Sequence, residues 1–184
     1  MNNIKTTYQQ VVPAGNNGEL VYRTSLKPLE WPATGEVRQG PYDCAPTHCV
    51  NNNQSSAIDI HNPEGVEGTP IFATQGGTLR TFTDQYGGID ISIDDGRYKY
   101  YYVHLSRYSD CAVDGQEVAT GELIGYMGQT GEAGSPHLHY MIRDQNDNVL
   151  PEQTFRSLLP IPDIRVTNPL TQVATIYTGK NCQS

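Results

Sequence analysis

The sequence predicts a mainly β protein, with antiparallel strands arranged in a sheet or sandwich and one short helix near the C-terminus. The 184 residues include 18 Gly, 12 Pro and 12 Tyr but only 3 Phe and 3 Met. This composition suits strands joined by tight turns better than a bundle of helices. Short runs of β-forming residues also recur every ~8–12 residues between glycine-containing turns, which is the spacing of all-β domains.

Seven segments are rich in β-branched, aromatic or alternating apolar residues, and each is predicted to be a strand. In chain order they are residues 56–61, 69–74, 78–83, 89–93, 98–105, 122–127 and 137–143. Asp94-Asp95-Gly96 lies between two of these runs and is predicted to form a hairpin turn. The one predicted helix covers residues 152–159 and ends at Pro160, which cannot continue it.

The chain is predicted to hold one domain, because a domain averages ~150 residues. We place this domain at residues 29–160. Residues 1–28 are polar and form a predicted N-terminal extension with a β-type run at 19–24. Residues 161–184 form a predicted C-terminal tail with a second such run at 173–177.

The charge and hydropathy of the chain exclude several classes of function. Lys and Arg total 12 and Asp and Glu total 20, which leaves a net charge of −8. This argues against nucleic-acid binding, which needs a basic face, and against a polybasic membrane anchor. No segment approaches the ~20 apolar residues of a transmembrane helix. The first ten residues lack an apolar core, so no signal peptide is predicted in this chain. We expect a monomer.

The four cysteines, Cys44, Cys49, Cys111 and Cys182, allow three sets of disulfide pairs. We favour a local Cys44–Cys49 disulfide and a Cys111–Cys182 disulfide that fastens the C-terminal tail. Four unpaired thiols are one alternative. Another is a zinc knuckle that includes His48, although its fourth ligand is not evident. Because disulfides form in oxidising compartments, the expected location is extracellular or periplasmic.

Four residues in the predicted strands carry side chains suited to a metal centre. His137 and His139 are two apart in one strand, so both imidazoles face the same side. Asp59 has apolar neighbours on both sides, and a carboxylate in such a place must be paired or bound to a metal. His104 lies in a strongly β-type run. Taken singly, each has an ordinary alternative: a surface histidine pair, a loop-capping aspartate and a structural histidine.

The order of these residues and of the segments around them carries more information than any one of them. The segments are Leu29-Glu30-Trp31-Pro32, Gly35-Glu36-Val37, Ala57-Ile58-Asp59-Ile60, Gly68-Thr69-Pro70-Ile71-Phe72-Ala73, Gly76-Gly77, Tyr102-Val103-His104-Leu105-Ser106, Gly115-Gln116-Glu117-Val118, Gly121-Glu122-Leu123-Ile124-Gly125, Gly128-Gln129-Thr130-Gly131 and Ser135-Pro136-His137-Leu138-His139-Tyr140. Between about Trp31 and Pro160 the chain therefore resembles the lysostaphin-type zinc metallopeptidases, which cut peptides of bacterial cell walls. The resemblance implies a duplicated-hybrid-motif β fold with a central groove.

The resemblance also implies roles for individual residues. Asp59 and His139 match two metal ligands of the family. His104 and His137 match its two unligated histidines, which handle protons and stabilise developing charge. The family's first zinc ligand is a histidine four residues before the aspartate, where this chain has Ser55. A serine hydroxyl is a poor zinc ligand, so this departure puts the third ligand in doubt.

Three alternatives for the third ligand remain open. His48 lies eleven residues before Asp59 and can be presented by the intervening loop, which a Cys44–Cys49 disulfide would stiffen. His61 is two residues after Asp59 and faces the same side, but it is more suited to the rim of the site. The third alternative is that no ligand replaces the missing histidine.

The leading hypothesis is a zinc-dependent endopeptidase that hydrolyses peptide bonds of peptidoglycan. His48, Asp59 and His139 would hold the zinc, His137 would accept the proton of the attacking water, and His104 would stabilise the oxyanion. The alternative is a catalytically degenerate relative that acts as a cell-wall-binding module or an amidase activator. A further hypothesis is that residues 1–28 lie across the groove and block it.

Overall fold

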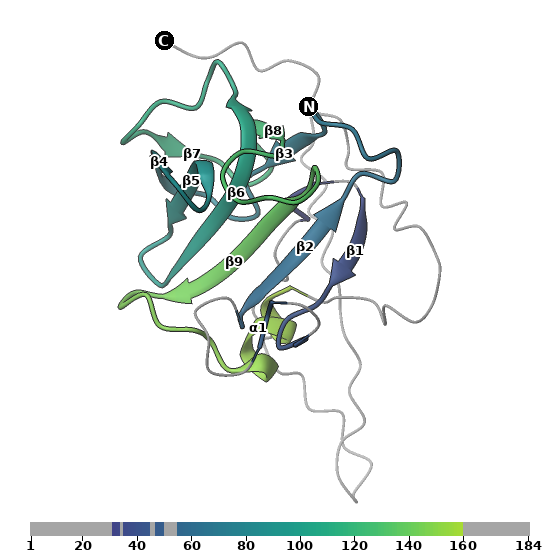
Figure 1. The fold of residues 1–184 in the computed structure, drawn as a ribbon. Helices are drawn as coiled ribbons and strands as arrows, with labels where there is room; N and C mark the ends of the chain where they lie inside the picture. Colours follow the sequence, from purple (N-terminus) through teal and green to yellow (C-terminus); the bar gives the residue numbers. More distant parts are fainter. Residues whose placement is uncertain (1–30, 34, 45–46, 50–54, 160–184) are drawn as a thin grey trace, which may run out of the picture.

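The structure, a computed structural model, describes residues 31–33, 35–44, 47–49 and 55–159. These residues form nine strands and one short helix (Figure 1). The elements are β1 (Glu36–Gln39), β2 (Ala57–His61), β3 (Pro70–Phe72), β4 (Gly77–Asp84), β5 (Gly88–Asp94), β6 (Tyr98–Tyr108), β7 (Glu117–Val118), β8 (Leu123–Met127), β9 (Leu138–Asp144) and α1 (Glu152–Leu158).

The strands form one antiparallel sheet whose order differs from their order in the chain. The main path is β1-β2-β9-β6-β5-β4-β7, and β3 pairs with β8, which joins the sheet through β6. The long strand β6 pairs with β5, β8 and β9. The last strand, β9, therefore lies between β2 and β6 (Figure 1). This insertion brings residues from three distant parts of the chain onto neighbouring strands.

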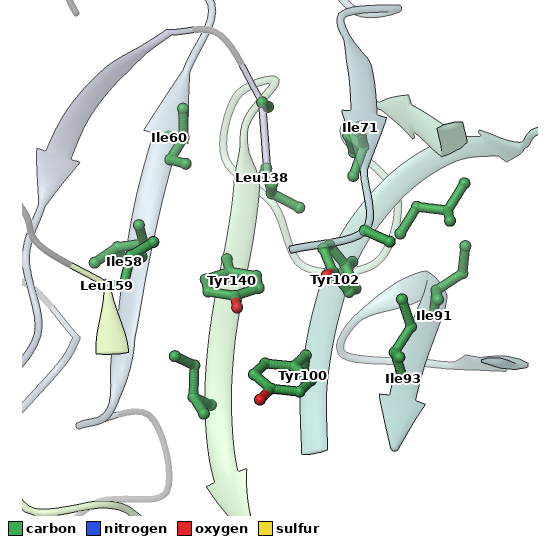
Figure 2. Close-up of a cluster of buried hydrophobic side chains, with 14 of the residues drawn as sticks. Ile58, Ile60, Ile71, Ile91, Ile93, Tyr100, Tyr102, Leu138, Tyr140 and Leu159 are labelled. Atoms are coloured by element: carbon green, nitrogen blue, oxygen red, sulfur yellow. The ribbon is translucent and has the colours of Figure 1, made fainter. Parts of the chain in front are cut away.

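The apolar core covers one face of this sheet. Side chains from β2, β9 and β6 gather there with isoleucines of β3 and β5, as Figure 2 shows. Ile58 and Ile60 of β2 and Tyr140 of β9 are each at most 1% exposed. Asp59 lies between the two isoleucines in β2, and His139 comes just before Tyr140 in β9. Because successive side chains of a strand point to opposite faces, Asp59 and His139 face away from the core.

All seven predicted strands and the predicted helix occur in the structure, with ends that shift by up to three residues. The predicted turn at Asp94-Asp95-Gly96 also forms, since the Asp95 backbone N–H donates to the Tyr98 carbonyl. Gly96 has a φ of +83°, which glycine adopts readily. The β-type runs in the sequence did not predict β7, because a strand of two residues is too short to show an alternating pattern. The strand β1 was suggested only by the family resemblance.

Several predictions concern the ends of the chain. The extension at 1–28, the tail beyond Pro160, and the β-type runs at 19–24 and 173–177 lie outside the described residues. The predicted Cys44–Cys49 disulfide forms, so the zinc knuckle and the unpaired-thiol alternatives are wrong for these two cysteines. Cys111 is also disulfide-bonded, while its predicted partner Cys182 is not among the described residues. Within the described part, no helix is long and apolar enough to span a membrane.

A small polar network is enclosed in the core. The Thr74 hydroxyl lies 2.9 Å from the Tyr102 hydroxyl and 2.8 Å from the Tyr140 hydroxyl. The Thr74 backbone N–H also donates to the Tyr102 hydroxyl at 2.8 Å. All three residues are fully buried, so these polar atoms depend on one another for hydrogen bonds.

We expect Thr74→Val to lower the free energy of unfolding by ~1–3 kcal/mol, because it keeps the shape of the side chain but leaves a buried tyrosine hydroxyl without its partner. Thr74→Ser is the matched control, since it retains the hydroxyl and removes only a methyl group. Chemical denaturation of both variants checks this. A Thr74→Val protein as stable as the wild type would show that the network contributes nothing net.

Candidate metal centre

The sheet places Asp59 and His139 directly opposite each other. They are register partners in the antiparallel pair of β2 and β9. The His139 Nδ1 and the Asp59 Oδ1 atoms are 2.7 Å apart, and both residues are buried. Within the described part of the chain, the other ring nitrogen of His139, Nε2, is buried without a hydrogen-bond partner.

His48 joins this pair from the segment that precedes β2. Its side chain is fully buried. The Nε2 atom lies 3.4 Å from the His139 Nδ1 and 3.4 Å from the Asp59 Oδ1. The three residues thus form one group of ligand atoms, all within 4.8 Å of one another.

The hydrogen bond at the other side of the His48 ring decides which nitrogen is free to bind. The His48 Nδ1 atom lies 2.9 Å from the Gly40 carbonyl oxygen. A carbonyl only accepts, so Nδ1 carries the proton and Nε2 keeps its lone pair. This backbone contact is the kind that orients a metal-binding histidine and selects its tautomer.

Two of the three separations between the ligand atoms fit a zinc ion. Zinc binds His nitrogen and carboxylate oxygen at ~2.0–2.2 Å in tetrahedral sites, which puts neighbouring ligand atoms ~3.4 Å apart. The two distances from the His48 Nε2 have this value. The third, 2.7 Å between Asp59 and His139, is a hydrogen-bond distance. The donor types and the two distances from His48 therefore suit zinc.

The protonation states also suit ligation. Burial by itself would raise the pKa of Asp59, but hydrogen bonds with His139 and His48 outweigh it and hold the pKa well below its usual range. Burial lowers the pKa of His139, although the Asp59 carboxylate acts in the opposite direction. At neutral pH the group therefore combines an ionised carboxylate with a neutral His139 imidazole, the form that a cation binds.

His104 and His137 lie next to this group. Their ring centroids are 4.8 Å apart, and the His137 Nε2 is 3.9 Å from the Asp59 Oδ1. The His104 Nδ1 lies 3.0 Å from the Gly87 carbonyl and 2.9 Å from the Thr130 carbonyl. Burial, reinforced by the nearby His137, lowers the pKa of His104 to about 4, so its ring is neutral at pH 7.

Two further residues considered from the sequence lie close by without joining the three ligand atoms. The His61 ring stacks on the His137 ring, with centroids 4.9 Å apart and an interplanar angle of 12°. Burial and the proximity of His137 lower the pKa of His61 to about 4. The Ser55 hydroxyl donates to the Cys49 carbonyl. Through ring contacts, all five histidines of the chain form one connected cluster.

Asp90 is a residue of the site that the sequence reasoning missed. Pairing of β5 with β6 skips a residue, because Ile89 pairs with Leu105 and Ile91 pairs with Tyr102. The result is a β-bulge in which His104 adopts a φ of +67°, and bulges commonly redirect a side chain.

The buried Asp90 carboxylate accepts the His104 backbone N–H at 3.2 Å and so supports this bulge. A sequence signal for Asp90 existed. It lies between Ile89 and Ile91, the same pattern of a carboxylate among apolar strand residues that singled out Asp59.

Residues 53–151, just over half of the chain, match peptidase family M23. The chain belongs to this family. The match includes Asp59, His104, His137 and His139, whereas His48 precedes it. This assignment confirms the resemblance to lysostaphin-type peptidases inferred from the motifs.

Relatives of the chain include named peptidases. It is 35% identical to the glycyl-glycine endopeptidase ALE-1 of Staphylococcus capitis over 105 residues, which are 55% of this chain and 26% of that protein. It is 36% identical to lysostaphin of Staphylococcus simulans over 105 residues, 55% of this chain and 20% of lysostaphin. The crystal structure of a zinc containing peptidase from Vibrio cholerae matches with a TM-score of 0.53 and 26% identity, covering 65% of this chain and 38% of that one. The chain thus spans about a quarter or less of these two curated relatives.

Asp90 leads to a prediction about the pH dependence of stability. Burial raises its pKa from the ordinary 3.8 to about 7, so the folded protein holds this proton more tightly than the unfolded chain does. The contribution of Asp90 to stability is therefore fully present below pH 3.8, and it is lost progressively as the pH rises from there to about 7. Asp90→Asn keeps an oxygen for the His104 N–H and does not ionise.

We expect Asp90→Asn to raise the Tm of the metal-free protein, and to raise it more at pH 8 than at pH 5. Thermal unfolding followed by circular dichroism in the presence of a chelator checks this. Equal Tm gains at both pH values would show that Asp90 of the folded protein is already ionised at pH 5.

Proposed function

We propose that the protein is a zinc-dependent endopeptidase that hydrolyses peptide bonds of bacterial peptidoglycan. The observation that carries the proposal is the placement of His48 Nε2, Asp59 Oδ1 and His139 Nδ1 as one group of ligand atoms in a domain of family M23. The names of relatives support the reaction class, since ALE-1 is a glycyl-glycine endopeptidase. We assign the peptidase unit to residues 29–160.

His48, Asp59 and His139 would hold the zinc, which when bound polarises the scissile carbonyl and lowers the pKa of a water molecule. These ligands come from a loop and two strands, and each has a contact that orients it. His48 donates to the Gly40 carbonyl, while Asp59 and His139 are register partners in the sheet. The alternative of a degenerate, non-catalytic relative rested on Ser55. The position of His48 supplies a third ligand atom and favours the enzyme.

The hydrogen bonds of His104 and His137 favour an exchange of the roles suggested by the sequence. The His104 Nδ1 faces two carbonyls, so it carries a proton and leaves Nε2 as an acceptor. A neutral His104 in this tautomer can take the proton of the attacking water, but it cannot donate to an oxyanion through Nε2. The opposite tautomer, with the proton on Nε2, is unfavourable because the Nδ1 lone pair would then face the lone pairs of both carbonyl oxygens. We therefore assign the role of general base to His104.

His137 is better suited to donate. Its Nδ1 contacts a single carbonyl, that of the exposed Ser135, at 2.8 Å. Water can replace this ring contact at an exposed carbonyl, so the His137 ring can change tautomer and carry its proton on Nε2 at lower cost than the His104 ring can. We assign to His137 the hydrogen bond to the developing oxyanion and to the leaving amine, contacts worth ~3–4 kcal/mol in related chemistry.

The setting of the reaction follows from the same observations. The Cys44–Cys49 disulfide supports an oxidising compartment, so we place the protein outside the cytoplasm, in the extracellular space or the periplasm. The proposed substrate is a peptide within or between peptidoglycan stems, and we propose that the protein acts as a monomer. A groove for this substrate stays a prediction from the family resemblance.

We expect His48→Ala to lose both bound zinc and hydrolysis of purified peptidoglycan, because only two ligands remain and a catalytic zinc site normally uses about three protein ligands. Metal content is measured by atomic emission after dialysis, and hydrolysis by the release of soluble wall fragments. His61→Ala is the matched control, a histidine at the edge of the same cluster, and it should keep its zinc. Wild-type zinc and activity in His48→Ala would contradict the ligand assignment.

We expect His104→Ala to lower kcat by ~10²–10⁴ while about one zinc per chain is retained, because the base is lost and the ligands are not. Steady-state kinetics on a synthetic cell-wall peptide, together with the metal count, separates this result from that of His48→Ala. Unchanged kcat in His104→Ala would remove this residue from proton transfer and return that role to His137.

A further inference from the structure

His48 differs from the other two proposed ligands in how the fold holds it. Asp59 and His139 are in β2 and β9, where the backbone hydrogen bonds of the sheet fix their positions. His48 lies outside every strand and helix, between β1 and β2. A side chain on a loop must be fastened by specific contacts, because an unconstrained loop loses conformational entropy when its ligand binds. The contacts around His48 show where this fastening occurs.

The residue after His48 is tied at two points. Cys49 forms a disulfide with Cys44, and this bond closes a short ring of the chain that includes His48. The Cys49 carbonyl also accepts a hydrogen bond from the Ser55 hydroxyl. Ser55 is 1% exposed, and its own carbonyl accepts the Tyr42 backbone N–H at 2.8 Å. Ser55 thus links the segment that carries His48 to the residues just before β2.

The other side of the segment is fastened to the end of β1. The Thr47 hydroxyl, next to His48, donates to the Gln39 Oε1 at 3.2 Å. The Gln39 Nε2 donates to the Asp43 carbonyl at 2.9 Å. Together with the contact between the His48 Nδ1 and the Gly40 carbonyl, these hydrogen bonds hold the segment that carries His48 against the end of β1. The disulfide and the Ser55 hydrogen bond at Cys49 fasten the residue that follows His48.

We propose that Ser55 and the Cys44–Cys49 disulfide are the positioning elements of the metal centre, and that zinc affinity depends on both. Ser55 occupies the position at which the family resemblance predicted a ligand, four residues before Asp59. In this chain it acts instead through Cys49 to hold the replacement ligand. The inference rests on the proposed function, since it takes His48 as a zinc ligand. It also means that reduction of a single disulfide weakens metal binding.

The experiment measures the zinc affinity of the full chain by competition with a chromophoric chelator. We expect Ser55→Ala and the double variant Cys44→Ser/Cys49→Ser each to bind zinc ~10–100-fold more weakly, as is usual when a residue that supports a metal ligand is lost. Unfolding of each metal-free variant is followed in parallel, so that weaker binding by a folded protein is separated from a general loss of structure.

Ser56→Ala is the matched control for Ser55→Ala. Ser56 is the next residue in the chain, is also 1% exposed, and donates its hydroxyl to the Ile142 carbonyl at 2.8 Å. Its loss removes a buried hydrogen bond from the residue just before β2 to β9, but it leaves the disulfide and the Ser55 hydrogen bond at Cys49 intact. We expect Ser56→Ala to keep the zinc affinity of the wild type, even where its metal-free stability falls as much as that of Ser55→Ala.

The same assay separates failure of this inference from failure of the proposed function. If His48→Ala binds zinc as tightly as the wild type, His48 is not a ligand and the proposed site is wrong. If His48→Ala loses zinc while Ser55→Ala and Cys44→Ser/Cys49→Ser both keep the wild-type affinity, the ligand set stands and the positioning role is overturned. Equal losses in Ser55→Ala and Ser56→Ala would also overturn it, because the effect would then be one of general stability.

Discussion

The pairing of β2 with β9 is the constraint on which the site depends. It sets Asp59 opposite His139, residues 80 positions apart in the chain, at 2.7 Å between their polar atoms. Strand register has a period of two, so a slip by one residue would turn Asp59 into the core and bring Ile58 or Ile60 to the other face. The core prevents this slip, since both isoleucines are buried there (Figure 2). The apolar face therefore fixes the geometry of the polar one.

A single carboxylate organises a cluster of imidazoles. Asp59 contacts His48 and His139, and it lies within 3.9 Å of His137. Burial lowers the pKa of His104 and of His61, so these two rings, each in contact with His137, are neutral at pH 7. Neutral rings are required both for ligands and for a general base. The backbone completes the arrangement, because carbonyls of Gly87, Thr130 and Gly40 select the tautomers.

Much of the fold was predictable, because alternating apolar residues and glycine turns are local signals. The same-face argument for His137 and His139 used only the period of a strand, although His137 lies just before β9 begins. The position of His104 was harder to predict. Its left-handed backbone and its support by Asp90 arise from a bulge, and a bulge depends on how two strands pair. The pattern Ile89-Asp90-Ile91 showed an unusual carboxylate but not its partner.

The sequence by itself determined the strands and the family resemblance, and from that resemblance came the prediction that Ser55 stands where the family has a ligand. It left His48, His61 and a missing ligand as three alternatives, because no local pattern relates a loop residue to a strand eleven positions later. Tertiary structure sets where these residues lie by packing, and their positions support the proposal of His48 as the third ligand. The disulfide, the Ser55 hydroxyl and the Gly40 carbonyl bring His48 to within 3.4 Å of both other ligand atoms, while His61 stacks on His137. Contacts between distant residues depend on the folded chain as a whole, and so they lie beyond what local patterns predict.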